Sequence, residues 1–369
     1  MICYSSVASC WKYEHISTKK ITTWVSTVLV IVADDLTGAL DTAAPFAARG
    51  LATQVTLTPR ALEDALAQSP DVISVNLASR EKPAEEALTL VRQVVAMLPP
   101  GVRLFKKVDS RLKGHVEVEL DGIAYQRALV APAIPAFGRI VQDGHVKGFG
   151  VDVPLSIRGV LGRHATRSII IDASTHQDLA HALQRADAEG IDLLVGARGL
   201  AEALAIRMTG HVDGPLVAIP NGPGLFVIGS HDQITLVQVD RLRNLDTVFY
   251  RPAPNGLLAQ ADDAPSPLVL VQATPGEGQM SSEDVAQHLA TSVHPRLTAG
   301  AKTLLLCGGA TAEAVLARMG IESFRLQGEC MPGLGLAYAG GQCIIAKSGG
   351  FGEPETLAIL AGKLHEGRG

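Results

Sequence analysis

Short runs of β-branched and aliphatic residues alternate with longer segments of helical periodicity along this chain, and this alternation constrains its fold more than any other feature. The pattern begins with the run Val28–Val32 and starts afresh at Leu225–Ile228, after a stretch dense in glycine and proline between residues 210 and 224. Strands that alternate with helices form largely parallel sheets that are buried on both faces. The sequence therefore predicts an α/β protein of two domains, each a largely parallel sheet flanked by helices, with the active site in the cleft between them.

The expected elements follow from the same pattern. In the first half the expected strands are Val28–Val32, Val55–Leu57, Val72–Leu77, Leu104–Val108, Leu129–Ala131, Ile169–Ile171 and Leu193–Val195, and the expected helices are Ala84–Met97, Gln177–Ala188 and Leu200–Met208. In the second half the expected strands are Leu225–Ile228, Thr247–Tyr250, Leu268–Val271, Leu304–Leu306 and Ile344–Ala346, and the expected helices are Ile234–Leu242, Ser282–Val293 and Ala312–Met319. A helical stretch also follows the first strand, and we expect Pro45 to kink it or to make it restart.

The length of 369 residues exceeds what one ordinary hydrophobic core organises, which favours two domains. The turn signals near residues 215–223 place the boundary there, so we expect a first domain over residues 28–218 and a second over residues 224–369. Residues 1–27 are polar and rich in Ser and Thr, and they lack the apolar stretch and the cleavage site of a signal peptide. We expect them to form a poorly structured extension.

The composition of the chain limits which partners and which cellular compartment we expect. The formal net charge is −5, aromatic residues make up 4% of the chain, and no dense stripe of Lys and Arg occurs, which argues against nucleic acid as a partner. No segment has the ~18 apolar residues that a membrane-spanning helix needs. The five cysteines form no CxxC pair and no cluster with histidine at zinc-like spacing. We therefore expect reduced thiols and no zinc site in a cytoplasmic protein without a membrane partner.

An acidic turn follows the first predicted strand. Asp34 and Asp35 stand at its carboxyl end, where open α/β sheets bind their ligands, and Thr37-Gly38 begins the next helix. Carboxylates in this place suit proton removal from a hydroxyl or hydrogen bonding to hydroxyls. One Asp could instead cap the helix, and Asp41, one turn further on, could join the pair or face water.

A basic loop follows another predicted strand, at residues 106–115. Its cations, with Asp109 and Ser110 beside them, suit a substrate that carries a carboxylate. The alternative is a solvated loop, which is what most runs of charge are. Arg139 and His145 lie near a proline-rich loop and a predicted hairpin downstream, and both are candidates for contact with the same ligand.

Three glycine-rich corners follow strands of the second half. They are Gly229-Ser230, the segment Gly308–Thr311 with Thr311 at the expected helix N-cap, and the segment Lys347–Gly352. Backbone N–H groups at such corners suit phosphate, although a single corner of this kind is also a common packing device. No GxxxxGK[ST] loop occurs, and no GxGxxG opens a strand–helix unit with an acidic residue at the expected distance. The second half is therefore predicted to bind a nucleotide without either of these motifs.

Together these motifs resemble those of the four-carbon acid sugar kinase family. The matching segments, in the family's order, are Ala33–Ala39, Lys107–Ser110, Ala131–Arg139, Gly229-Ser230, Gly308–Thr311 and Lys347–Gly352. The resemblance extends from Val28 onward and implies an N-terminal acid-sugar domain and a C-terminal ATP domain. It also implies phosphorylation of the terminal hydroxyl of D-threonate, D-erythronate or a 3-oxo-tetronate. Related members act on a branched oxo-acid sugar, similar to 3-oxo-isoapionate, and this alternative stays open.

The chain departs from the family's usual pattern in two loops. The usual Asp-Ser-Thr-Leu-Arg-Gly-Asn is here Asp-Ser-Arg-Leu-Lys-Gly-His at residues 109–115, and Gly350 replaces the usual Asn of the last glycine loop. Arg111 and Lys113 keep positive charge in the first of these loops. An acid substrate is therefore still expected, whereas its identity is left open.

The residues and the resemblance together predict an ATP-dependent sugar-acid kinase in which Mg²⁺ bridges the phosphates of ATP. Asp35 or Asp34 would orient and deprotonate the acceptor hydroxyl. The acid would be bound by Thr37, Lys107, Asp109, Ser110, Arg111, Lys113 and Arg139. ATP would be bound by Ser230, Gly308, Gly309, Thr311, Lys347, Gly349 and Gly352. A nicotinamide-dependent dehydrogenase and a non-catalytic sugar-acid sensor are the rival functions, and a homodimer is left open as the assembly.

Overall fold

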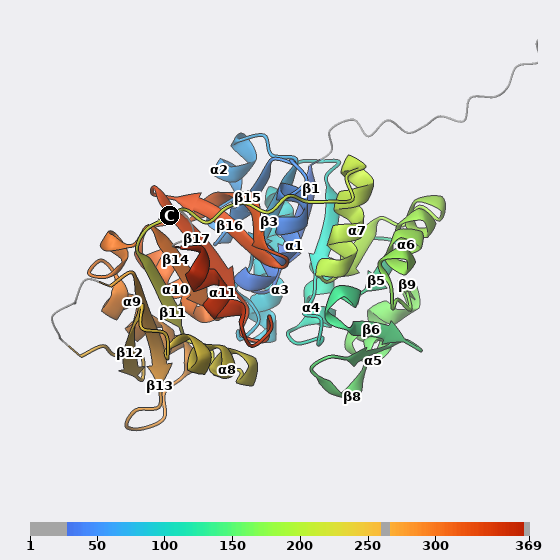
Figure 1. The fold of residues 1–369 in the computed structure, drawn as a ribbon. Coiled ribbons are helices and arrows are strands. Elements are labelled where there is room, and N and C mark those ends of the chain that lie inside the picture. The colour runs from blue at the N-terminus through green and yellow to red at the C-terminus, as the bar shows by residue number, and fades with distance from the viewer. Residues whose placement is uncertain (1–27, 260–265, 365–369) are drawn as a thin grey trace, which may run out of the picture.

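The computed structural model describes residues 28–259 and 266–364. The expectation for residues 1–27 therefore lies outside the described residues. Two lobes, residues 28–209 and 224–364, lie side by side and are joined by a linker (Figure 1). No helix in the described ranges is long and apolar enough to cross a membrane.

The first lobe contains seven parallel strands with helices around them (Figure 1). Their order in the sheet is β2 (Thr53–Thr56), β3 (Val72–Asn76), β1 (Leu29–Ala33), β4 (Arg103–Lys107), β10 (Leu193–Gly196), β5 (Ala128–Ala131) and β9 (Ser168–Ile170). The helices are α1 (Leu36–Ala47), α2 (Leu62–Ala67), α3 (Ala84–Met97), α4 (Val116–Leu120), α5 (Ile157–Leu161), α6 (His176–Ala188) and α7 (Arg198–Thr209). A separate antiparallel sheet consists of β6 (Arg139–Gln142), β7 (His145–Gly148) and β8 (Val151–Ser156).

The second lobe contains five parallel strands followed by two antiparallel ones. Their order is β12 (Val248–Pro254), β13 (Leu268–Thr274), β11 (Gly224–Ile228), β14 (Thr303–Cys307), β17 (Gln342–Lys347), β16 (Leu334–Ala339) and β15 (Ser323–Met331). Its helices are α8 (Gln233–Leu242), α9 (Ser282–Val293), α10 (Gly309–Arg318) and α11 (Thr356–Lys363). The predicted α/β class and the predicted mostly parallel strands are confirmed.

The strands of the two lobes form one continuous sheet of fourteen strands among the described residues. The junction is an antiparallel pairing of β15 with β2, in which Phe324 lies opposite Val55. Neither β15 nor β16 is predicted from the sequence, so the sequence suggests two separate sheets where the structure has a joined one. This junction fixes the strand ends of one lobe relative to those of the other.

Helix α1 is the central helix of the molecule, and all but one of its residues are buried. It packs against α7 of its own lobe and against β15 and β16 of the second lobe. Pro45 does not interrupt it, contrary to expectation, because the proline stands in the last turn and the helix ends two residues later. The carbonyl oxygen of Asp41, which a proline at position 45 leaves without its helical N–H partner, accepts a hydrogen bond from Arg198 Nη1 at 3.1 Å.

Candidate functional site

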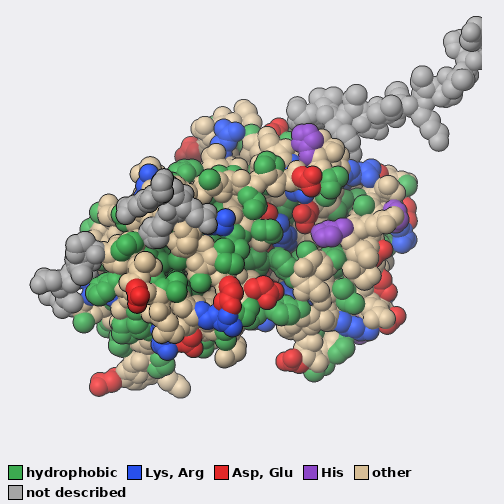
Figure 2. Space-filling model, viewed as in Figure 1, with side chains coloured by type: hydrophobic (Ala, Val, Ile, Leu, Met, Phe, Trp, Pro, Cys, Tyr) green, Lys and Arg blue, Asp and Glu red, His purple; other side chains and the backbone are tan. Residues whose placement is uncertain are grey.

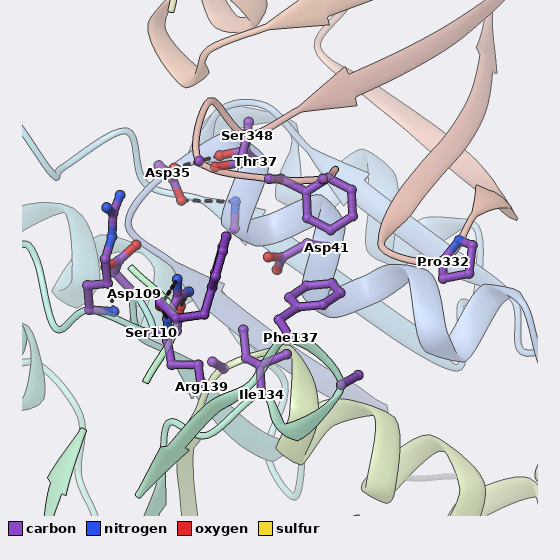
Figure 3. A pocket seen from close by; sticks show the side chains of 18 of the residues that line it. Asp35, Thr37, Asp41, Asp109, Ser110, Ile134, Phe137, Arg139, Pro332 and Ser348 are labelled. Carbon is purple, nitrogen blue, oxygen red and sulfur yellow. Dashed lines mark hydrogen bonds between the residues drawn. The ribbon is translucent and has the colours of Figure 1, made fainter. Parts of the chain in front are cut away.

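A cavity of about 370 Å³ lies between the two lobes and is lined by residues of both (Figure 3). The first lobe contributes the residues after β1, the basic loop after β4 and the loop before β6. The second lobe contributes the last glycine loop, including Ser348, Gly350 and Gly352. Figure 2 shows an indentation of the surface where the two lobes meet. Of the two aspartates after β1, Asp35 lines this cavity together with the last glycine loop, and Asp34 does not.

Asp35 has both of the roles considered for it, because it caps a helix and also lines the cavity. Its carboxylate accepts hydrogen bonds from the backbone N–H of Gly38 at 2.9 Å and from Thr37 Oγ1 at 2.8 Å. A side chain at Gly38 would collide with this carboxylate and would come within 2.6 Å of Lys107 Nζ. The glycine therefore permits the close approach of the aspartate turn and the lysine.

Arg80 binds both aspartates, and no motif in the sequence singles it out. Its guanidinium donates to Asp34 through Nε and Nη2, both at 2.8 Å, and to Asp35 through Nη1 at 2.7 Å and Nη2 at 2.9 Å. Burial alone would raise the pKa of Asp34, but the charge and hydrogen bonds of Arg80, with Lys106 and Lys107, hold that pKa below its usual value. Asp34 is therefore a buried partner of Arg80 whose charged form is favoured, and Asp35 is the member of the pair that lines the cavity with the last glycine loop.

Lys107 and Asp41 both line the cavity, and each affects the pKa of the other. Burial would lower the pKa of Lys107, but Asp41, Asp35 and Asp34 raise it above its usual value, so its ammonium stays charged. Burial raises the pKa of Asp41, and the charge of Lys107 offsets this only in part. The carboxylate of Asp41 points into the cavity (Figure 3). The sequence had left open whether Asp41 faces water or joins the pair, and the structure places it in the same cavity.

The basic loop lies against the aspartate turn, because the point where a Cβ on Gly114 would stand is 2.6 Å from Asp34 Oδ2. Asp109, Ser110 and Arg111 line the cavity with Arg139, whose Nη1 donates to Ser110 Oγ at 2.6 Å. The other guanidinium contacts of Arg139 are from Nε at 3.0 Å and Nη2 at 2.8 Å to the carbonyl oxygen of Phe149. Lys113 is exposed and is not part of the cavity lining.

Of the two candidate contact residues near the hairpin, only one lines the cavity. Arg139 lines the cavity, but His145 does not, and its Nδ1 instead contacts the carbonyl oxygen of Asp143 at 2.7 Å. Phe137 of the first lobe meets Phe351 of the second edge to face, with ring centroids 5.1 Å apart. This pair forms an apolar wall where the lobes touch.

The three glycine corners converge at the strand ends of the second lobe. A side chain at Gly229 would collide with Thr311 Oγ1, and one at Gly349 would collide with Ser230 Oγ. Gly308, with φ at +106°, is the N-cap of α10. Thr311 is therefore not the N-cap expected from the sequence but lies in the first turn of the helix.

The N-terminus of α10 faces the aspartate turn of the other lobe. Asp35 Oδ2 lies 3.6 Å from the point where a Cβ on Gly309 would stand. Helix N-termini carry partial positive charge and free N–H groups that attract anions. The phosphate-type corner and the carboxylate expected to remove a proton therefore lie next to each other.

Lys347 stabilises the last glycine loop through hydrogen bonds from inside the second lobe. Its side chain is fully buried, and its ammonium donates to the carbonyl oxygen of Ser348 at 3.0 Å and to Thr235 Oγ1 at 3.3 Å. Burial lowers its pKa below the usual value. The structure thus places this lysine inside the second lobe, whereas Ser348, Gly350 and Gly352 line the cavity.

Glu313 is a second residue that sequence reasoning missed. It stands on α10, and its Oε1 accepts hydrogen bonds across the lobe boundary from Asn76 Nδ2 at 2.8 Å and from the backbone N–H of Leu36 at 3.3 Å. Burial, assisted by the nearby charge of Asp35, raises the pKa of Glu313 to about 7. It lines a second cavity of about 480 Å³ together with Asp34, Asp35 and Gly309.

A protein-held metal has no obvious cage in the part of the chain that the structure describes. No group of three or more His, Cys, Asp or Glu side chains there is arranged to hold a metal ion. Magnesium in particular is commonly bound by one or two carboxylates together with substrate phosphates and water.

Two family models, several curated proteins and several solved structures are similar to this chain. Residues 29–160 match the family model of a sugar-binding N-terminal domain, and residues 225–357 match that of a nucleotide-binding C-terminal domain. The chain is 30% identical to D-threonate kinase of Cupriavidus necator over 89% of this chain and 96% of that protein. It is 29% identical to D-threonate kinase of Bordetella bronchiseptica, over 92% of this chain and 98% of that protein.

A 3-oxo-tetronate kinase of Methylobacterium radiotolerans is also 29% identical, over 89% of this chain and 97% of that protein. Among solved structures, a Haemophilus influenzae protein superposes with a TM-score of 0.63 at 19% identity, over 91% of this chain and all of that one. A Salmonella typhimurium protein described as a putative tRNA synthase gives a TM-score of 0.67 at 19% identity, over 90% of this chain and 98% of that one. At these identities the two structures show the fold alone.

Proposed function

This chain belongs to the four-carbon acid sugar kinase family, and we propose that it transfers the γ-phosphoryl group of ATP to the terminal hydroxyl of D-threonate, D-erythronate or a 3-oxo-tetronate. The observation that carries the proposal is the position of Asp35, which lines the first cavity together with the last glycine loop and the second cavity together with Gly309 at the N-terminus of α10. The proposed sugar-acid site and the proposed nucleotide site thus both adjoin the carboxylate of Asp35.

Asp35 is the proposed base. In the transfer step the acceptor oxygen forms a bond to the γ-phosphorus while the bond from that phosphorus to the β–γ bridging oxygen breaks, so ADP leaves. The hydroxyl proton passes to the carboxylate of Asp35 and from there to solvent. Asp34 accepts two hydrogen bonds from Arg80, as Asp35 does, but it does not line the cavity with the last glycine loop, and its proposed role is to hold Arg80 in place. The protein contributes mainly alignment and charge neutralisation, which dominate phosphoryl transfer.

The acid is proposed to bind in the first-lobe part of the cavity. Arg139 and Lys107 would attract the carboxylate, and Ser110, Asp109 and Thr37 would bind hydroxyls, since all five line the cavity. Arg–carboxylate pairing is strong and directional. Lys113 is left out of this site because its side chain is exposed outside the cavity.

ATP is proposed to bind over the corners of the second lobe. Backbone N–H groups at Gly308, Gly309 and Gly349, with the hydroxyls of Ser230 and Thr311, would receive its phosphates. Mg²⁺ would arrive bound to the phosphates of ATP, because the described side chains form no cage for it. Lys347 would act indirectly, by fixing the loop that contains Ser348 and Gly352.

A coupled assay for ADP release tests the proposal over a panel of four-carbon acids, with a branched oxo-acid sugar and a five-carbon acid as comparisons. We expect ADP release to depend on one of the four-carbon acids and to yield one phosphomonoester per ADP. Nucleotide turnover that ignores every acid would contradict the proposal. Turnover of the branched acid alone would favour the related activity, and oxidation of an acid with NAD would favour a dehydrogenase.

A further inference from the structure

We propose that Arg111 acts on the phosphoryl group in transfer and not on the carboxylate of the acid. The inference rests on the proposed kinase function and reassigns a residue that the sequence pattern had placed among the ligands of the acid. Three observations support this inference: the position of the Arg111 guanidinium, the lack of an ion pair to it among the described residues, and the hydrogen bonds that hold the neighbouring Arg139.

The guanidinium of Arg111 crosses from the first lobe to the second. Its Nη2 lies 3.4 Å and its Cζ 3.9 Å from the point where a Cβ on Gly350 would stand. Asp232 Oδ2 lies 3.2 Å from that same point, and Asp232 is the N-cap of α8. Gly350 and Asp232 belong to the corners after β17 and β11, so the cation lies where the phosphate-type corners converge.

No acidic side chain in the described ranges forms an ion pair with Arg111. Its only hydrogen bond there is from its backbone N–H to Asp109 Oδ1 at 2.8 Å, which shapes the loop and leaves the guanidinium free. By contrast, Arg80 and Arg198 are each bound to carboxylates. An unpaired guanidinium that lines a cavity is available to an anionic ligand.

The neighbouring Arg139 has a different environment. Its guanidinium is held within the first lobe by Ser110 and the carbonyl oxygen of Phe149. Burial, followed by repulsion from Arg111, lowers the pKa of Arg139, while Asp109 opposes the shift. Two positive charges thus share one wall of the cavity, and an anion between the lobes would relieve their repulsion. Arg139 lies on the acid side of that wall and Arg111 on the nucleotide side.

A cation in the position of Arg111 would stabilise charge that develops in transfer. Negative charge on the equatorial oxygens of the γ-phosphoryl group and on the departing β–γ bridging oxygen is what a guanidinium neutralises in phosphoryl-transfer enzymes. Because Arg111 comes from the lobe that holds the acid, this charge would be in place only when the two lobes are together. Such an arrangement also favours transfer to the acid over transfer to water.

The test compares Arg111→Ala, Arg111→Lys and Arg139→Ala with wild type. For Arg111→Ala we expect kcat to fall by ~100-fold or more, the effect of removing one preorganised donor to developing negative charge, and we expect Arg111→Lys to recover part of this loss. Calorimetric binding of the acid without nucleotide should stay within about threefold of wild type, whereas Arg139→Ala should weaken it by ~10-fold or more. Arg158→Ala, an exposed arginine that lines neither cavity, is the control and should match wild type.

The outcomes separate the two proposals. If wild type turns over no sugar acid, the proposed function fails and the inference fails with it. If wild type is active but Arg111→Ala weakens binding of the acid by ~10-fold while kcat is kept, Arg111 is a carboxylate ligand and the inference alone is overturned. Urea midpoints equal to that of wild type show that neither effect comes from misfolding.

Discussion

Replacing Arg80 by alanine would leave a buried carboxylate without its main counter-charge, and this change offers a quantitative test of the aspartate turn. Asp34 is 2% exposed and receives two charge-assisted hydrogen bonds from Arg80. Removing one partner of a buried ion pair costs ~3–5 kcal/mol, whereas an exposed pair contributes only ~0–1 kcal/mol. Lys106 and Lys107 also stabilise the charge of Asp34. We therefore expect the free energy of unfolding of Arg80→Ala to be about 3 kcal/mol lower than that of wild type, at the lower end of that range.

The loss should depend on pH with a definite sign. In wild type the pKa of Asp34 is lowered, so the stability it contributes is present above its unfolded pKa and is lost as pH falls through the folded value. Without Arg80, burial would dominate and raise the folded pKa of Asp34. The penalty should then be largest at about pH 7.5 and should shrink towards about pH 5 as Asp34 takes up a proton.

Urea unfolding at these two pH values measures the effect, with two matched controls. Arg80→Ala combined with Asp34→Asn should recover much of the loss, because the uncompensated charge is gone. Arg92→Ala, an exposed arginine on α3, should change stability by less than ~0.5 kcal/mol. A loss below ~1 kcal/mol for Arg80→Ala, or an equal loss at both pH values, would refute the role assigned to Arg80.

Two further predictions concern the site. Asp35→Asn should lower kcat by ~100-fold or more with ATP affinity within a few-fold of wild type, as measured by steady-state kinetics and nucleotide titration; full activity would move the base elsewhere. Glu313 has a folded pKa of about 7 against an ordinary 4.5, so its stabilising contribution is present below the unfolded pKa and is lost as pH rises through the folded value. The variant Glu313→Gln stays neutral and keeps an acceptor for Asn76, so its stability relative to wild type should increase between about pH 5 and about pH 8. Urea midpoints measured over this pH range test the prediction, and midpoints of the two proteins that change in parallel with pH would contradict it.

The α/β architecture could be predicted because its signals are local. Ala84–Met97 and Ser282–Val293 have the predicted bounds in the structure, since helical periodicity and flanking turn residues lie within each segment. The junction of the lobes could not be predicted in this way. Strand β15 contains charged Arg325 and Glu329, and it pairs with a strand of the other lobe that is far away in sequence.

Site residues that belong to a motif at the end of a strand could be predicted from the sequence. Site residues that reach the cavities from other segments could not. Asp35, Lys107 and Ser110 follow strands and meet in the cavity. Arg80 follows β3 beside Glu81 and Lys82 and belongs to no recognised motif, and the pairing of β3 with β1 brings it to the aspartates. Glu313 lies on a helix, where an acidic residue usually faces water, and only the other lobe buries it.

A crystal structure with a non-hydrolysable ATP analogue and the preferred acid would test most directly whether the two substrates meet between the lobes. We expect the terminal hydroxyl oxygen of the acid within about 3 Å of a carboxylate oxygen of Asp35 and in line with the γ-phosphate at the N-terminus of α10. An acid bound outside the cavity, or a γ-phosphate directed away from Asp35, would contradict the proposed mechanism.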